Sequence, residues 1–212
     1  MTNFARHARL AGLFYLGIIL LGIGAEGALR GPLIDWTDAA GTAQAIQDRL
    51  FLFRLSMVFD IGMALLDVSL AVLFFRMLRG VNDGLALTAM VFRLMQAAVI
   101  AASIMALYAA GQALPENPLP ALERHAAGYD LGLIFFAMNT LIMARLLSMP
   151  GLAPRSLCWT LAAAGVVYLL GGLTRFLTPD LNTMMQPAYL IPVVAEIWLM
   201  GWLLVKGPKV AG

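Results

Sequence analysis

Six long apolar runs constrain the fold of this 212-residue chain more than any other feature. Each run has about the 20 residues that an α-helix needs to cross the hydrocarbon core of a bilayer. Short polar segments separate them, and the runs lie near residues 10–29, 52–75, 85–110, 126–147, 157–177 and 188–205. We therefore predict an all-α polytopic membrane protein with six transmembrane helices, folded as one helical-bundle domain over residues 1–212.

Composition supports a membrane protein and argues against nucleic acid as a partner. Hydrophobic residues make up 61% of the chain and charged residues only 12%, whereas soluble domains carry roughly 25% charge. The net charge is +2, and the basic residues are scattered, with no stripe that could follow a phosphate backbone. The first run resembles a secretory signal peptide, but five more runs follow it, so we expect an uncleaved first helix.

The arginine and lysine residues predict how the helices are oriented. Eight of them lie on the side of the two chain ends and four on the opposite side. The first group is Arg6, Arg9, Arg76, Arg79, Arg145, Arg155, Lys206 and Lys209, and the second is Arg30, Arg49, Arg124 and Arg175. Because cytoplasmic loops are enriched in these residues, we predict that both termini face the cytoplasm. On the outer surface, Asp38 is placed to cap an amphipathic helix that runs towards Leu50.

Charged side chains inside the apolar runs are the best guide to function. Each would cost roughly 2.5 to 3.5 kcal/mol at the centre of an isolated membrane helix, so each must be paired or hydrated. They are Glu26, Arg54, Asp60, Asp67, Arg93, Asp130 and Glu196.

Asp67 and Arg93 are expected to form an ion pair. Asp67 lies nine residues before Arg76, near the end of the second run, and Arg93 lies nine residues after Gly84, at the start of the third. The two side chains therefore reach a similar depth on neighbouring helices, where a carboxylate and a guanidinium can form charge-assisted hydrogen bonds. A structural clamp is the favoured interpretation, and a proton or gating switch is the alternative.

The other polar groups gather in the predicted outer half of the membrane. Pro192, one turn before Glu196, predicts a kink beside that acid. We predict an outward-facing pocket that binds a small polar or amphipathic ligand, or protons, for transport or sensing. The ligand-binding candidates are Glu26, Asp60, His125, Tyr129, Asp130 and Glu196. For Arg30, Arg54 and Arg175 we favour an interfacial position, where the side chain only solvates a helix end. The same interpretation is the alternative to ligand binding for His125.

Two other functional classes remain open. A membrane-embedded enzyme, such as a metal-assisted hydrolase, would use His125, Asp130 and Glu26 together. A structural or partner-binding bundle would pair every buried charge and leave no cavity. The two histidines cannot supply a bis-histidine haem or a three-histidine zinc site inside the membrane, because His7 precedes the first run. We therefore expect no cofactor and no metal, and favour a protein that is not an enzyme.

Several short motifs are spread along nearly the whole chain. They include Arg9-Leu10-Ala11-Gly12-Leu13, Phe53-Arg54-Leu55, Phe92-Arg93-Leu94, Leu131-Gly132-Leu133 and the closing Pro192 and Glu196. These motifs resemble a bacterial family of multi-pass membrane proteins catalogued as domain of unknown function 4386. The resemblance implies a six-helix protein of the bacterial inner membrane. It supplies no activity, substrate or catalytic residue. Expected partners are the lipid bilayer and a small ligand, and the pattern is compatible with a homo-oligomer.

Overall fold

The computed structural model describes residues 3–149 and 152–207, and all regular elements within them are helices. Lys209, which entered the orientation prediction, lies outside the described residues. The elements are α1 (Asn3–Ile23), η1 (Gly24–Arg30), η2 (Gly31–Leu33), α2 (Ala39–Asp48), α3 (Leu50–Leu78), α4 (Asp83–Gln112), α5 (Leu119–Ser148), α6 (Arg155–Leu177), α7 (Pro179–Met185), η3 (Gln186–Tyr189) and α8 (Leu190–Val205).

Six helical segments of the described chain are long and apolar enough to cross a membrane, which confirms the predicted fold class. Each predicted apolar run lies inside one of them. The segments are Ala5–Leu33, Leu50–Leu78, Asp83–Gln112, Leu119–Ser148, Arg155–Leu177 and Pro179–Val205. Large apolar side chains such as Leu20, Leu65 and Met105 are exposed on their outer faces. Lipid tails are suited to cover such faces, because they offer no hydrogen bonds and require none. The orientation with both termini inside stays a prediction.

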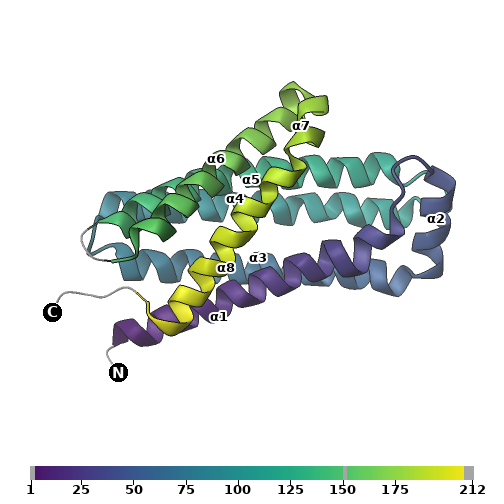
Figure 1. Cartoon of the computed structure of the whole chain (residues 1–212). Helices are drawn as coiled ribbons and strands as arrows, with labels where there is room; N and C mark the ends of the chain where they lie inside the picture. Colours follow the sequence, from purple (N-terminus) through teal and green to yellow (C-terminus); the bar gives the residue numbers. More distant parts are fainter. Residues whose placement is uncertain (1–2, 150–151, 208–212) are drawn as a thin grey trace.

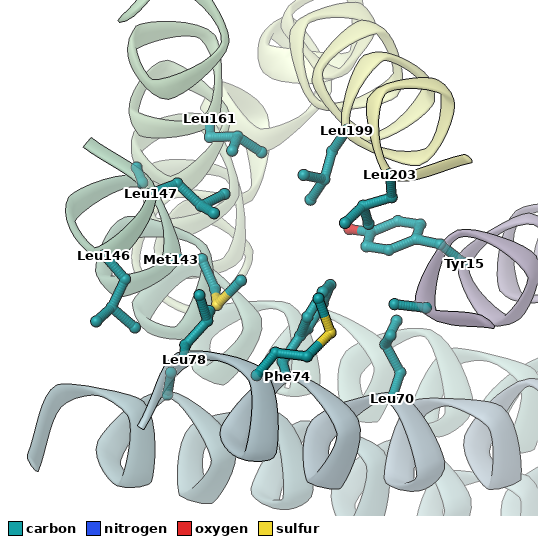
Figure 2. Packing of buried hydrophobic residues seen from close by; sticks show 14 of the residues in the cluster. Tyr15, Leu70, Phe74, Leu78, Met143, Leu146, Leu147, Leu161, Leu199 and Leu203 are labelled. Atoms are coloured by element: carbon teal, nitrogen blue, oxygen red, sulfur yellow. The ribbon is translucent and has the colours of Figure 1, made fainter. Parts of the chain in front are cut away.

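The helices pack tightly at one end of the bundle and diverge at the other. In Figure 1, α3, α4 and α5 lie side by side, while α6 leans away from them and α8 crosses back to reach α1 near both termini. The main core lies at the end that carries the termini. Figure 2 shows Tyr15, Phe74, Met143, Leu161 and Leu203 converging there from α1, α3, α5, α6 and α8.

At the opposite end, a smaller apolar cluster joins α2, α3, α4 and α5. Phe53 and Ile46 are fully buried in it. The predicted N-cap of α2 is confirmed, because Asp38 Oδ1 accepts a hydrogen bond of 2.8 Å from the Gly41 amide. In the preceding connection the Thr37 hydroxyl and amide both donate to Asp35 Oδ1. These bonds hold the pKa of the Asp35 carboxyl below its ordinary value and so favour the charged form.

Two backbone features depart from the sequence prediction. The end of the first span is a π-helix, η1, in which the Gly31 amide donates to the Glu26 carbonyl. Such segments are rare and often mark functional sites. The predicted kink at Pro192 is wrong, because α8 begins only at Leu190. Pro192 therefore lies in the first turn, where a missing amide costs no helical hydrogen bond. The change of helix type falls at η3 instead.

Candidate ligand-binding cavity

A cavity of about 410 Å³ lies at the end of the bundle opposite the termini, where the helices diverge. Its volume is in the range of small-molecule binding sites. The polar wall consists of Glu26, Arg30, Asp60, His125, Tyr129, Asp130, Gln186 and Tyr189. The remaining wall is formed by Gly22, Ile34, Trp36, Leu107, Leu122, Ala126 and Leu133. Five of the six residues predicted to bind ligand therefore share one cavity.

Arg30 organises the wall between η1 and α3. Its side chain is only 3% exposed, and its Nη1 donates to Asp60 Oδ2 at 2.7 Å. The same nitrogen reaches Ser56 Oγ at 3.2 Å, while Nε and Nη2 both donate to Glu26 Oε2. The interfacial interpretation of Arg30 is therefore wrong. It fails because Arg30 closes the π-helix facing α3, where two carboxylates stabilise its charge.

Each of these carboxylates keeps one oxygen free of partners within the described part of the chain. Arg30 occupies Asp60 Oδ2 and Glu26 Oε2, and neither Asp60 Oδ1 nor Glu26 Oε1 bonds to another described residue. Asp60 is buried, whereas the Glu26 side chain is 66% exposed and so lies at the mouth of the cavity. Arg30 therefore neutralises charge without using the full capacity of either acid to accept hydrogen bonds.

Asp130 provides a third carboxylate on the opposite wall. Its Oδ2 lies 3.6 Å from Nε of Arg175 on α6, and Arg175 Nη2 donates to Glu123 at 2.7 Å. Arg175 thus joins α5 to α6 and does more than solvate a helix end. The sequence could not show that it lies between two acids. It does not line the cavity. The cavity wall itself carries three carboxylates and one guanidinium.

His125 presents a hydrogen-bond acceptor to the cavity. Its Nδ1 lies 3.0 Å from Ser103 Oγ and 3.2 Å from the Ser103 carbonyl on α4. Because the Ser103 hydroxyl donates to the Ile100 carbonyl, the bonding network assigns the ring proton to Nδ1. Nε2 is then the unprotonated nitrogen, and it has no partner among the described residues. His125 is buried, so its interpretation as a residue that solvates a helix end is wrong.

Close packing of α4 against α5 sets the position of His125. A Cβ at Gly128 would approach Ser103 Cβ to 2.6 Å, and one at Gly132 would approach Ile100 to 2.7 Å. Only glycine lets the two backbones come this close. Asp130, between the two glycines, points to the other side of α5 and reaches α6.

Aromatic rings line the rest of the cavity. Trp36 belongs to the connection after η2, Tyr129 to α5 and Tyr189 to η3. The His125 and Tyr129 rings meet edge to face, with centroids 6.2 Å apart. Neither tyrosine hydroxyl in the cavity bonds to another described residue. The cavity thus combines apolar walls and ring faces with several free acceptor atoms.

A second polar layer lies deeper in the bundle, outside the cavity. Arg93 Nη2 donates to Asp67 Oδ1 at 2.5 Å, and Gln96 donates to Asp67 Oδ2 at 3.2 Å. The contact expected between Asp67 and Arg93 is thus present, joining α3 to α4. The Arg93 guanidinium also lies over the rings of Tyr15 and Phe136, at 5.2 and 5.1 Å from their centroids. Between the described side chains, the space beside Arg93 has no room for a water molecule.

Glu196 lies apart from the cavity, which corrects its grouping with the other five candidates. Its carboxylate accepts a hydrogen bond from the Tyr168 hydroxyl of α6, and it is not part of the cavity wall. In Figure 1, α8 crosses the bundle, and the bond to Tyr168 shows that Glu196 faces α6. Asp67 is likewise outside the cavity.

The three residues of the enzyme alternative share the cavity, but among the described residues they do not bond to one another. His125, Asp130 and Glu26 all line the cavity, but each bonds to a different partner: Ser103, Arg175 and Arg30. Within the part of the chain that the structure describes, no group of three or more His, Cys, Asp or Glu side chains could hold a metal ion. The Ser103 hydroxyl contacts His125 Nδ1 and already donates a hydrogen bond to the Ile100 carbonyl.

Sequence reasoning missed several wall residues. Trp36 comes from the connection after η2, and Gln186 and Tyr189 come from the short 3₁₀ helix η3, which the sequence did not predict. For Arg30 there was a signal, since it follows Glu26 by four residues and the two can pair on one helical face. What the sequence did not show was the π-helical turn that brings the pair against α3.

Together, the six apolar spans, the charge-rich cavity at one end and the buried polar layer below it define a polytopic α-helical membrane protein with a polar cavity between its helices. Within this class, the chain belongs to the family described as Domain of unknown function (DUF4386), whose model matches residues 10–207. Comparison with curated proteins and with solved structures gives no match.

Proposed function

We propose that this protein binds a small amphipathic organic cation in the cavity, as the recognition step of transport or sensing. The observation that carries this proposal is the balance of charge and hydrogen-bond capacity on the wall. Three carboxylates face the cavity, and the single guanidinium there already donates to Glu26, Asp60 and Ser56.

The free polar atoms favour a cation over an anion. Asp60 Oδ1, Glu26 Oε1 and His125 Nε2 are acceptors, so their lone pairs attract the positive charge of any ammonium group, and one that carries an N–H can also donate to them. An anion would face these same lone pairs, and Arg30 could not turn to it without leaving Asp60 buried and unpaired. The rings of Trp36 and Tyr129 can also attract a cation through their faces.

The apolar walls favour a ligand that carries a hydrocarbon body. Leu107, Leu122 and Leu133 line the cavity from α4 and α5, opposite Gly22 of α1. A bare metal ion would leave these surfaces wet, whereas an aryl or alkyl amine would cover them. The expected ligand is therefore a small primary, tertiary or quaternary amine with one apolar group.

Binding for transport or sensing fits the closed floor of the cavity. The Asp67–Arg93 pair, whose side chains are only 3% and 2% exposed, lies deeper in the bundle than the cavity and does not line it. If the termini are cytoplasmic in a bacterial inner membrane, as the charge distribution favours, the cavity faces outward. A transporter would have to open this layer, and a sensor would only have to shift it. The presence of a cavity counts against a purely structural bundle.

Benzyltrimethylammonium and its uncharged carbon isostere neopentylbenzene provide a matched pair of probes. Calorimetric titration of the purified protein is expected to show at least about tenfold tighter binding of the cation, because the carboxylates contribute about 1.4 kcal/mol or more to that ligand alone. Asp130→Asn and Asp60→Asn should each weaken the cation about tenfold and leave the isostere unchanged.

Asp48→Asn is the matched control, because it removes the same charge from α2 without touching the cavity wall. Asp130→Asn keeps the experiment decisive if Asp60→Asn fails to fold, since the Asp130 side chain is 20% exposed and is not essential to a dry core. Equal affinity for both probes in the wild-type protein, or unchanged cation affinity in both cavity variants, would overturn the proposal.

A further inference from the structure

A second groove, of about 360 Å³, lies at the other end of α5 from the ligand cavity. The last turns of α5 and the first turns of α6 form its two walls. Leu141, Ala144, Arg145 and Ser148 line it from α5, and Arg155, Cys158, Trp159 and Ala162 line it from α6. Both sets recur every three or four residues, so each forms one stripe along its helix. The groove therefore runs along the two antiparallel helices.

Polarity changes along the groove from one end to the other. Because α5 and α6 are antiparallel and joined by a short connection, Arg145, Ser148 and Arg155 gather at the end of the groove nearest that connection. Leu141 and Ala162 lie at the opposite end, deeper in the bundle. Gly165 closes the groove there, since a Cβ on it would come within 2.7 Å of Leu141. A polar mouth above an apolar channel is the arrangement that an amphiphile with a charged head group requires.

Two guanidinium groups at the polar mouth have no partner among the described residues. Arg145 and Arg155 are exposed, and neither makes an ion pair or side-chain hydrogen bond with a described residue. Arg79, at the same end of the bundle, does pair with a carboxylate, Asp83, at 3.5 Å. Among the described residues Asp83 is the one acid at this end, so little negative charge is available to the two arginines.

We propose that this groove binds an anionic phospholipid, with its phosphate on Arg145 and Arg155 and an acyl chain along the apolar channel. The planar guanidinium fork matches phosphate oxygens and can donate two parallel hydrogen bonds. Trp159 is 76% exposed beside the arginines, as expected for an indole at the level of the head groups. This site is independent of the proposed function, because it shares no residue with the ligand cavity.

Lipid is favoured over free phosphate by the apolar part of the groove. A free phosphate would occupy only the arginine end and leave the surfaces of Leu141, Ala144 and Ala162 uncovered. A bound acyl chain covers these surfaces and is held at the correct depth by the bilayer itself. Basic pockets between transmembrane helices are known to recognise anionic head groups in this way.

Native mass spectrometry of the full-length protein, titrated with phosphatidylglycerol or phosphatidylcholine, tests the proposal. The wild-type protein is expected to bind phosphatidylglycerol about tenfold or more tightly than phosphatidylcholine. The double variant Arg145→Gln/Arg155→Gln should bind phosphatidylglycerol roughly thirtyfold more weakly, since each arginine near the membrane surface contributes about a fivefold effect. Its binding of phosphatidylcholine should not change.

The control is Arg6→Gln/Arg76→Gln, which removes two exposed charges from the same end but not from the groove. It should retain the wild-type preference. Equal losses of phosphatidylglycerol affinity in both double variants would overturn the proposal, because they would show a general attraction of anionic lipid to the basic end of the bundle. Displacement of phosphatidylglycerol by inorganic phosphate at millimolar concentration would overturn the lipid assignment, whereas insensitivity to phosphate supports it.

Discussion

Replacing Arg93 with methionine is expected to lower the free energy of unfolding by about 3–5 kcal/mol, because it leaves the buried charge of Asp67 without its partner. The side chains of Arg93 and Asp67 are 2% and 3% exposed, so both charges are buried inside the bundle. The substitution also removes the cation from the rings of Tyr15 and Phe136. Reversible unfolding in mixed detergent micelles measures the effect.

Two further variants identify the cause of the Arg93→Met effect. Arg93→Met/Asp67→Leu removes both charges and should recover much of the loss, since a buried pair replaced by apolar side chains is often close to neutral. Arg54→Met removes an exposed arginine from α3 and should change stability by no more than about 0.5 kcal/mol. The clamp interpretation is contradicted if Arg93→Met is as mild as Arg54→Met, or if the double variant is less stable than Arg93→Met.

Replacing Arg30 with methionine is expected to cost about 3 kcal/mol of stability and, at the same time, to tighten the binding of an organic cation. This stability loss is at the lower end of the range of about 3–5 kcal/mol for breaking a buried ion pair. Asp60 borders the cavity, so water can hydrate its carboxylate when Arg30 is absent. Binding tightens because Asp60 and Glu26 then offer both carboxylate oxygens to the ligand. About tenfold higher affinity for benzyltrimethylammonium is the expected change.

The same variant links stability to ligand binding. A ligand that binds only the folded protein stabilises it by an amount that grows with its concentration relative to the dissociation constant. Benzyltrimethylammonium should therefore raise the apparent melting temperature of Arg30→Met more than that of the wild-type protein. Neopentylbenzene should have the same effect on both. Loss of cation binding in a folded Arg30→Met protein would show that Arg30 contacts the ligand rather than competing with it.

The spans and their order could be predicted from the sequence because lipid imposes a simple rule. A helix that crosses the bilayer must be apolar over about 20 residues, and this property can be seen without knowing any tertiary contact. The contact between Asp67 and Arg93 could be anticipated for a related reason. A short connection fixes two helices as antiparallel neighbours, so equal distances from the turn place residues at equal depth.

The residues that line the cavity were harder to predict from the sequence, because they depend on the rotation and tilt of each helix. Asp60, His125 and Asp130 were grouped correctly by depth, yet Glu196 was grouped with them although it faces Tyr168. Depth alone does not say which way a side chain points. Arg30 was misjudged because a π-helical turn, which has no clear sequence pattern, directs it against α3. Trp36 lies in a connection and Gln186 in the short helix η3, and the paths of both segments follow from tertiary packing.

The proposed function is tested most directly by locating a bound cation in the protein. Crystals grown with 4-bromobenzyltrimethylammonium allow the bromine to be found by its anomalous scattering. The expected position is among Leu107, Leu122 and Leu133, with the ammonium near Asp60 and within about 6 Å of the Tyr129 ring centroid. Bromine density outside this cavity, or an empty cavity at saturating ligand, would contradict the proposal.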